Sequence, residues 1–494
     1  MAIDPDLQKL AQELAADPNT PAWEDAADLS RLHAQSFATK AAGGFEILAS
    51  TTGGSSSTTR RRKRVPGPTT PDLPNIYPRT TIAKLDRKKY ADREEAFPIG
   101  DVAPVVGMAP SFIRKVVGNK KLLDVADVVD LLDQDAFSET FVPRSRVLDY
   151  LFSTAEAEAA ERTQQLDDDQ KCKLINGDFM QVVDTLPEGS VQCVVTSTPY
   201  WGMRIYKDSR VVKWADGEEC AYGHEQTPEG FVRHTVEVLH RLRPVLTESA
   251  SIWWNLMDTY MTRTQIRGNA YEALQAMDGR NRKKWGDHEH HRYSAGHAYV
   301  KDGEQCGIPA LVASRASRIG YFTKSTITWA KIISLPEPQN SRVSRSLEYV
   351  MHFSTQRAPK FDKGAYRRLA TSLGGRNTLY EGDKLSDVWV LPVSSGGDGH
   401  GAQFPLALPG RCIAISTDVD DVVLDPFMGS GNTAVAALTL GRKVIGVDVS
   451  QQYLDVAEEK VRELEERLPI DTSVKASVEA AEEVLRKTSW AHDR

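Results

Sequence analysis

The stretch Val422–Ser450, VVLDPFMGSGNTAVAALTLGRKVIGVDVS, constrains the fold more than any other part of the chain. It predicts a buried strand, a glycine loop, a helix and a second strand that ends in an acid, Asp448. Such a unit belongs to a mostly parallel sheet covered by helices. Gly429 and Gly431 let the backbone approach a ligand at the start of the helix. Asp448 follows Asp425, in the first strand, at close to the ~20-residue offset expected of an acid that binds ribose hydroxyls. The stretch therefore predicts a site for a nucleoside-containing cofactor.

The same α/β texture begins at residue 171, where apolar runs alternate with amphipathic helices. The runs that predict strands are KLINGDF, VQCVVTS, SIWWNLM, TITWAKI, LEYVMHF, VVLDPF and KVIGVDV. A helix over residues 451–468 has Leu454, Val461 and Leu464 at helical spacing and is expected to cover one face of the sheet. The glycine loop also satisfies the dinucleotide pattern GxGxxG/A, so an NAD-dependent oxidoreductase is a rival interpretation that explains this loop alone.

The first part of the chain differs in composition from the α/β part. Residues 1–38 are acidic and predict helix, whereas residues 39–80 are rich in Gly, Ser, Thr and Pro and predict a flexible linker with a basic run at Arg60–Arg64. The last residues, 469–494, predict a helical tail. None of these segments is expected to build a core of its own.

Residues 97–150 predict a small helical domain with a break at Gly107. The pattern resembles a helix-turn-helix, in which Arg114 and Lys115 lie on the second helix and contact DNA. A helical bundle that only packs against its neighbour explains the same pattern equally well.

Composition and charge narrow the class of protein. The five cysteines form no CxxC pair, which argues against a disulfide framework and a zinc ribbon. The first residues are acidic where a secretory signal is basic, and no apolar run approaches the ~18 residues of a membrane span. A cytoplasmic protein without a membrane partner is expected. The net charge of −7 does not decide about nucleic acid, because the basic residues are clustered.

A second motif follows the predicted strand VQCVVTS. The stretch Thr196–Arg204, TSTPYWGMR, resembles the TSPPYWGLR motif of the beta class of DNA amino-methyltransferases. Asp425–Thr433 resembles the DPFxGSGxT loop of the same enzymes, and His400–Pro405 resembles their HxAxFP segment. Further matches occur in family order, so that the resemblance covers about residues 171–468; they are Tyr222–Pro228, Ile252–Asn255 with Asp258–Tyr260, Trp329–Lys331 and Arg345–Tyr349.

The resemblance implies a Rossmann-like methyltransferase sheet in circularly permuted order, because the catalytic motif precedes the cofactor motif. It implies S-adenosylmethionine as the cofactor and double-stranded DNA as the substrate. The residues that it places at the cofactor are Asp178, Phe404, Asp425, Phe427, Gly429, Ser430, Gly431, Thr433 and Asp448.

The resemblance also gives the loop Ser197, Thr198, Pro199, Tyr200 the catalytic role. Amino nitrogens of bases are poor nucleophiles because their lone pair is delocalised into the ring. The Ser197 hydroxyl and the Thr198 carbonyl are expected to accept the two amino protons and turn the lone pair toward the methyl group, without a covalent intermediate. The Tyr200 ring offers a stacking face to a flipped base, worth roughly 1–3 kcal/mol. The family carries a second proline at the position of Thr198, so this loop is expected to be less rigid.

The choice of base rests on one residue. In this family a serine at the position of Ser197 is associated with cytosine N4 and an aspartate with adenine N6, and we expect N4. A neutral hydroxyl accepts a proton from either amine, so adenine N6 is the alternative. A non-catalytic DNA-binding regulator with the same fold is a further alternative.

The segment 261–301 interrupts the family pattern with basic residues. A basic insertion beside a catalytic cleft suits DNA. The residues of this segment that we expect to contact DNA are Arg280, Arg282, Lys283 and Lys284. Trp201, beside Tyr200, is also expected to contact DNA. The histidines His288, His290 and His291 lack a fixed ligand geometry, and no metal is expected. The sequence determines neither the recognition site nor the oligomeric state, and a cognate restriction enzyme is a candidate partner.

Overall fold

A computed structural model describes residue 90 and residues 93–467, with gaps at 158–159, 168, 203–207, 262–263, 267–290, 294–299, 302, 332–340 and 394–403. These residues all lie in one compact unit, 78–494. The predictions for residues 1–38, 39–80 and 469–494 fall outside the described residues, as do those for Arg280, Arg282, Lys283 and Lys284. Within the described ranges, no helix is both long and apolar enough to cross a membrane.

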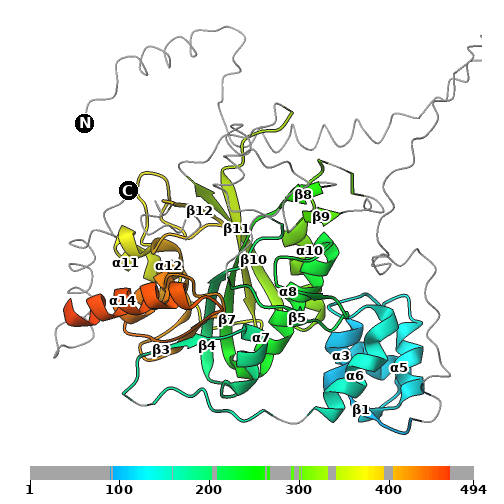
Figure 1. Ribbon diagram of the computed structural model, residues 1–494. Coiled ribbons are helices and arrows are strands. Elements are labelled where there is room, and N and C mark those ends of the chain that lie inside the picture. The colour runs from blue at the N-terminus through cyan, green and yellow to red at the C-terminus, as the bar shows by residue number, and fades with distance from the viewer. Residues whose placement is uncertain are drawn as a thin grey trace, which may run out of the picture. The chain divides into compact units, whose positions relative to one another are not determined.

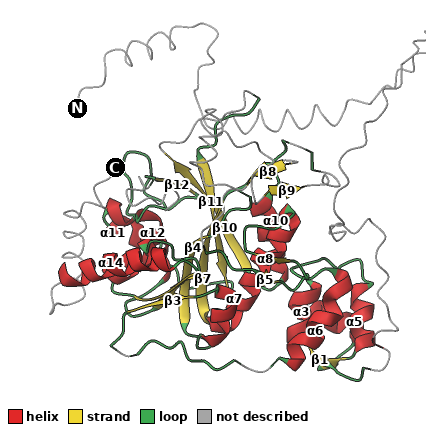
Figure 2. Ribbon diagram, in the orientation of Figure 1, coloured by secondary structure: helices red, strands yellow, loops and turns green. Residues whose placement is uncertain are grey.

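An eight-stranded sheet lies at the centre of this unit (Figures 1 and 2). Its strands are β3 (Cys172–Asn176), β4 (Val191–Ser197), β7 (Leu246–Leu256), β10 (Phe322–Lys331), β11 (Leu347–Ser354), β12 (Val388–Leu391), β13 (Val422–Asp425) and β14 (Lys443–Asp448). Their order is β12-β10-β11-β7-β4-β13-β14-β3. All neighbours are parallel except at β11, which is antiparallel to both β10 and β7. The expected mostly parallel sheet is confirmed, with β12 as an additional edge strand.

The order of the strands in the sheet explains where a ligand site can form. The late strand β13 lies beside the early strand β4, so the order in the chain is permuted relative to the order in space. From this pair the sheet continues to β14 on one side and to β7 on the other. In open parallel sheets, ligands bind at the carboxyl ends of the strands where the order reverses. Ser197 and Asp425 end these two strands, and both lie at that point.

Helices cover both faces of the sheet (Figure 2). They are α7 (Phe179–Val182), α8 (Pro228–Leu242), α10 (Ile308–Arg318), α11 (Ala365–Arg368), α12 (Ala407–Ser416), α13 (Asn432–Thr439) and α14 (Gln451–Arg467). Alternate side chains of β4 enter two separate cores: Val194 packs with α8 and α10, whereas Cys193 and Val195 pack with α12, α13 and α14. This alternation is what a strand buried on both faces requires. The helix expected over 451–468 is confirmed as α14.

The segment before the sheet is helical and belongs to the same unit (Figure 1). It consists of β1 (Phe97–Pro98), α3 (Ile99–Val106), α4 (Pro110–Val117), β2 (Leu122–Leu123), α5 (Val125–Leu132) and α6 (Val147–Glu156), and β1 pairs with β2 in antiparallel fashion. Gly107 ends α3 with φ +69°, and a Cβ there would lie 2.5 Å from the Ser138 carbonyl oxygen, so the turn requires glycine. An Asp124 capping box starts α5.

Short elements complete the described part. They are the ribbons β5 (Val212–Lys213) with β6 (Glu219–Cys220) and β8 (Thr264–Ile266) with β9 (His291–Tyr293), and the 3-10 turns Arg144–Arg146, Val183–Thr185, Arg243–Val245 and Thr371–Leu373. The β8–β9 ribbon brings together two parts of the segment 261–301.

Candidate active site

The loop after β4 contains the residues expected to be catalytic. Ser197 is the last residue of β4, and in the sheet it lies opposite Asn255 of β7. Thr198 is buried, whereas Ser197, Pro199 and Tyr200 are partly exposed. The loop therefore presents one hydroxyl, one ring and its backbone at the carboxyl edge of the sheet, where a substrate can reach them.

Asp425 joins this loop to the glycine loop. Its carboxylate is fully buried and accepts hydrogen bonds from the Thr196 hydroxyl at 2.6 Å, the Thr433 hydroxyl at 2.5 Å and the Phe427 amide at 3.0 Å. Burial raises the pKa of Asp425 to about 6, against the effect of these hydrogen bonds. Asp425 and Thr433, expected at the cofactor, thus bond to each other inside the fold and order the two loops.

The two glycines of the loop differ in what surrounds them. Both have positive φ, +54° at Gly429 and +89° at Gly431. A Cβ at Gly431 would lie 2.6 Å from the Cβ of Ala457 in α14, whereas a Cβ at Gly429 would enter open space. Packing therefore explains glycine at Gly431. At Gly429 the open space in front of the backbone fits a ligand that approaches closely.

Asp448 lies next to this open space. Its carboxylate accepts the Gly429 amide at 2.8 Å and the Ser450 amide at 2.9 Å, and burial raises its pKa. Each carboxylate oxygen keeps a further lone pair, which a ribose hydroxyl can use. The glycine backbone, the acid and the space between them fit the nucleoside part of S-adenosylmethionine.

The other residues expected at the cofactor surround the same loops. Asp178 caps α7 by accepting the Met180 amide at 2.9 Å, and burial raises its pKa. The Phe427 ring stacks on Tyr222 with centroids 5.2 Å apart. The Phe404 carbonyl accepts the Asn432 side-chain amide at 2.9 Å. Ser430 is buried, and its hydroxyl lies 3.4 Å from the Lys460 ammonium group.

A cluster of Asn255, Lys331 and Glu348, here called the Glu348 cluster, contacts the side chains of the catalytic loop. The Tyr200 hydroxyl donates to Glu348 Oε2. Asn255 Nδ2 lies 2.7 Å from the same oxygen, 2.8 Å from the Tyr200 hydroxyl and 3.2 Å from Ser197 Oγ. Lys331 forms an ion pair with the other oxygen of Glu348. Asn255 of β7 and Glu348 of β11 thus contact the loop, and Lys331 of β10 pairs with Glu348.

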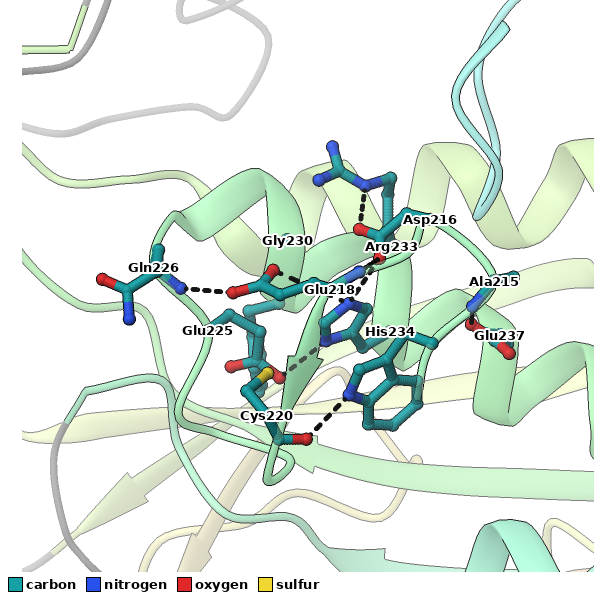
Figure 3. A network of polar contacts seen from close by, with 12 residues as sticks. Ala215, Asp216, Glu218, Cys220, Glu225, Gln226, Gly230, Arg233, His234 and Glu237 are labelled. Atoms are coloured by element: carbon teal, nitrogen blue, oxygen red, sulfur yellow. Dashed lines mark hydrogen bonds and ion pairs between the residues drawn. The ribbon is translucent and has the colours of Figure 1, made fainter. Parts of the chain in front are cut away.

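A second cluster, here called the His234 cluster, is formed by residues between 216 and 234 (Figure 3). Its members are Asp216, Glu218, Glu225, Arg233 and His234. His234 Nδ1 lies 3.1 Å from Glu225 and Nε2 lies 3.3 Å from Asp216. Burial alone would lower the pKa of His234, but these hydrogen bonds and charges raise it to about 9. His234 is therefore a buried cation between carboxylates.

The His234 cluster reaches the loop through Glu225. The Glu225 carboxylate accepts the Gly223 amide at 3.0 Å, and the Gly223 carbonyl accepts the Gly202 amide at 3.2 Å. The Glu225 carbonyl accepts the indole N–H of Trp201 at 3.1 Å. This cluster holds the backbone and the indole of the loop rather than its reactive side chains.

Trp201 corrects one sequence-based expectation. We expected it to contact DNA, but its side chain is fully buried and its only polar atom already bonds to Glu225. The aromatic ring follows Tyr200 directly, yet the turn points it into the core that α8 helps to form. Adjacent positions in a loop can face opposite environments, and the motif alone does not separate them.

The helical segment exposes the residues expected on its DNA-binding face. Of the eight residues of α4 only Ile113 is buried, while Arg114 and Lys115 are exposed. The segment is also tied to α10, because the Arg315 guanidinium donates to the Thr140 carbonyl at 3.0 Å. The exposure of Arg114 and Lys115 makes them accessible to a partner.

Sequence reasoning gave no role to Asn255, Lys331 or Glu348. Each lies in a segment that resembles the family, but a segment match carries no information about which side chain faces the loop. It also gave Tyr200 a role through its ring alone, whereas the structure engages its hydroxyl. The available signal was a polar residue at or next to the end of each of these strands: Asn255 in β7, Lys331 in β10 and Glu348 in β11.

Comparisons with known proteins agree with this geometry. A protein family described as DNA methylase matches residues 191–459, over half of the chain. The type II methyltransferase M.XycI of Xanthomonas campestris pv. cyanopsidis is 30% identical over 291 residues, 58% of this chain and 87% of that protein. The type II methyltransferase M.Cfr9I of Citrobacter freundii is 30% identical over 286 residues, 58% of this chain and 85% of that protein.

Among solved structures, a putative DNA modification methylase of Thermus thermophilus, TTHA0409, crystallised with S-adenosyl-L-methionine, is 22% identical and has a TM-score of 0.39 over 59% of this chain and 93% of that chain. The family match, residues 191–459, covers both the catalytic loop and the glycine loop. The chain therefore belongs to the family of S-adenosylmethionine-dependent DNA methyltransferases that methylate an exocyclic amino nitrogen, N4 of cytosine or N6 of adenine.

Proposed function

We propose that this chain methylates N4 of cytosine in duplex DNA, by direct attack of the amino nitrogen on the methyl group. One observation carries the proposal: the 2.6 Å bond from Thr196 to Asp425 ties the strand that ends in Ser197 to the strand that begins the glycine loop. A base at Ser197 and a cofactor at Gly429 would then meet at one edge of the sheet. This proximity supplies the orientation that the reaction needs.

The roles of the chain's residues follow from their positions. S-adenosylmethionine supplies an electrophilic methyl group when bound, and Gly429 and Asp448 are the groups that would hold its nucleoside part. The Ser197 hydroxyl and the Thr198 carbonyl would accept the amino protons of a flipped base. Tyr200 would stack on that base. Nothing in this scheme requires a metal ion or a covalent link to the enzyme.

The preference for cytosine rests on Ser197 and on the family resemblance of its motif. Mass-spectrometric analysis of DNA from cells that express the protein tests it. We expect N4-methylcytosine in the digest. N6-methyladenine would change the assigned target base but leave the proposed mechanism intact. C5-methylcytosine would contradict direct transfer to an amino group.

A variant of the catalytic serine tests the site itself. Ser197→Ala removes an acceptor for the amino protons, so we expect the single-turnover rate to fall by ~100-fold. Ser190→Ala is the matched control, since Ser190 stands just before β4 and its hydroxyl donates to the Pro187 carbonyl at 2.8 Å, away from the loop. Equal rates for the two variants would remove Ser197 from the site.

Two glycine variants test the cofactor site. Gly429→Ala places a methyl group in the open space, and we expect the affinity for S-adenosylmethionine to fall at least ~10-fold in calorimetry. Gly189→Ala is the control, because Gly189 has φ +60° and open surroundings but precedes β4. Both variants strain the backbone similarly. Unchanged affinity in Gly429→Ala would move the cofactor away from this loop.

We also propose that α4 contacts DNA through Arg114 and Lys115. The exposed basic face of α4 supports this role, and the basic segment 261–301 would add to it. Replacing both residues with Ala should weaken DNA binding and reduce the slope of log K against log salt, because fewer counterions are released. A slope equal to that of the wild type would assign α4 to packing alone.

The curated relatives are named type II methyltransferases. We therefore propose that this chain protects a specific site against a cognate restriction endonuclease. Mapping the modified positions in genomic DNA would give that site. Methylation scattered without a shared sequence would contradict the proposal.

A further inference from the structure

The contacts of the Tyr200 hydroxyl determine which groups donate hydrogen bonds and which accept them. Glu348 carries a carboxylate whose partners include a lysine, and an ionised carboxylate only accepts hydrogen bonds. The hydroxyl therefore donates its single hydrogen to Glu348 Oε2. Its lone pairs face the Asn255 amide at 2.8 Å and Ser197 Oγ at 3.3 Å. Because the Tyr200 hydrogen is already used, the 3.3 Å contact is one in which Ser197 donates.

This direction leaves the Ser197 oxygen as an acceptor. Its own hydrogen points to Tyr200, and the Asn255 amide lies 3.2 Å away. A lone pair of Ser197 is then available for an amino proton of the target base. The contacts form one chain of groups, from Ser197 to Tyr200 to Glu348, with Asn255 beside all three.

The reaction needs such a chain because it releases a proton. As the N–C bond forms and the S–C bond of the donor breaks, the electron pair of the S–C bond stays on sulfur. The amino nitrogen becomes positively charged and must lose one hydrogen. The departing thioether is a poor base, so the protein has to supply the acceptor.

We propose that Glu348 accepts the proton released by the methylated base, through the hydroxyls of Ser197 and Tyr200. The amino hydrogen moves to Ser197 Oγ, the Ser197 hydrogen moves to the Tyr200 oxygen, and the Tyr200 hydrogen moves to Glu348 Oε2. Both hydroxyls are restored, and the carboxylate becomes a carboxylic acid. The inference rests on the proposed direct transfer to an amino group.

Burial and charge suit Glu348 to this role. Its side chain is only 8% exposed, so water does not compete for Oε2, while Lys331, 21% exposed, forms an ion pair with the other oxygen of Glu348. Lys331 ends β10 at the same edge of the sheet and its ammonium group lies 5.2 Å from the centre of the Trp329 ring.

Two variants separate proton transfer from positioning. Tyr200→Phe keeps the stacking ring and removes the relay hydroxyl. Glu348→Gln keeps a group of the same shape whose single oxygen can still accept from Tyr200 and Asn255, although the contact with Lys331 is lost, and it is far less basic. With saturating cofactor and DNA, we expect each variant to lower the single-turnover rate ~100-fold. Tyr366→Phe is the control, since it also loses one hydroxyl bond, to the Gly382 carbonyl.

Two further readouts decide between the interpretations. Cofactor affinity by calorimetry and fluorescence of 2-aminopurine at the target position should match the wild type in Tyr200→Phe, because binding and base flipping do not need the hydroxyl.

A rate within twofold of the wild type in either variant would overturn the relay. Loss of the 2-aminopurine signal in Tyr200→Phe would also overturn it, since the hydroxyl would then position the base. These rate ratios hold for whichever amino group is methylated. An adenine product would thus refute the cytosine assignment without touching the relay, and C5-methylcytosine would refute the direct transfer on which the relay rests.

Discussion

The Glu348 cluster and the His234 cluster both hold the loop after β4, but they differ in which atoms they hold. The first contacts the hydroxyls of Ser197 and Tyr200. The second contacts the backbone and the Trp201 indole. Each cluster combines a carboxylate with a cation. The position of the cation separates them: Lys331 is partly exposed, whereas His234 is fully buried.

This difference predicts different consequences for the two clusters. A buried ion pair adds little net stability, yet removing one partner leaves an uncompensated charge and costs about 3–5 kcal/mol. Water can take the place of a partly exposed cation, so its loss costs less than the loss of a fully buried one. We therefore expect variants of the His234 cluster to affect the free energy of unfolding and variants of the Glu348 cluster to affect the reaction rate.

The largest expected effect is that of His234→Ala, about 3–5 kcal/mol in the free energy of unfolding. His352→Ala is a matched control, because both rings stack on tryptophan: His234 on Trp214 at 4.1 Å and His352 on Trp253 at 3.8 Å. Burial lowers the pKa of His352 to about 3, so it carries no charge at neutral pH. Urea denaturation measures both. Equal losses would mean that stacking, not charge, sets the stability of the His234 cluster.

The two histidines should also respond to pH in opposite directions. The folded pKa of His234, about 9, lies above its unfolded value of 6.5, so its contribution is complete below about pH 6.5 and is lost as the pH rises through 9. His352 has a lowered pKa, so its contribution is complete above about pH 6.5 and declines as the pH falls. The difference in unfolding free energy between wild type and His234→Gln, measured from about pH 6 to 9.5, should shrink with rising pH. A constant difference would show that His234 does not carry the buried charge.

Trp201→Phe should have an intermediate effect, a loss of about 1–3 kcal/mol from one hydrogen bond and the space left by the smaller ring. Its DNA affinity should keep the salt dependence of the wild type, because the buried ring is not a DNA contact. Thermal unfolding and a salt titration check the two statements. A weakened DNA affinity in a fully stable variant would restore Trp201 to the DNA interface.

The smallest effect on stability is expected for Lys331→Met, because the ammonium group is partly exposed and water can take its place beside Glu348. Its single-turnover rate should nevertheless fall below that of the wild type, since Glu348 loses the cation with which it forms an ion pair. Chemical denaturation and a single-turnover assay separate the two quantities. A large loss of stability with an unchanged rate would make Lys331 a structural residue and remove the contrast between the clusters.

Local patterns determined much of this protein. Hydrophobic periodicity predicted the apolar strands between β3 and β14 and the helix α14. The placement of glycines predicted the loop before α13. Both patterns depend only on residues that are neighbours in the chain. The edge strand β12, Val388–Leu391, was missed because four residues carry too little periodicity. The two motifs were recognisable because each is continuous in the chain.

The tertiary structure decided which side chains meet. Glu348 reaches Tyr200 across 148 residues of chain and Asn255 reaches Ser197 across 58, because β11 and β7 lie near β4 in the sheet. Strand order depends on how all helices and strands pack together, and no local pattern encodes it. The same packing turned Trp201 into the core and left Tyr200 at the edge. The sequence by itself thus determined the loops and the cofactor class, whereas the sheet decided which carboxylate the catalytic loop touches, since that contact exists only between strands distant in the chain.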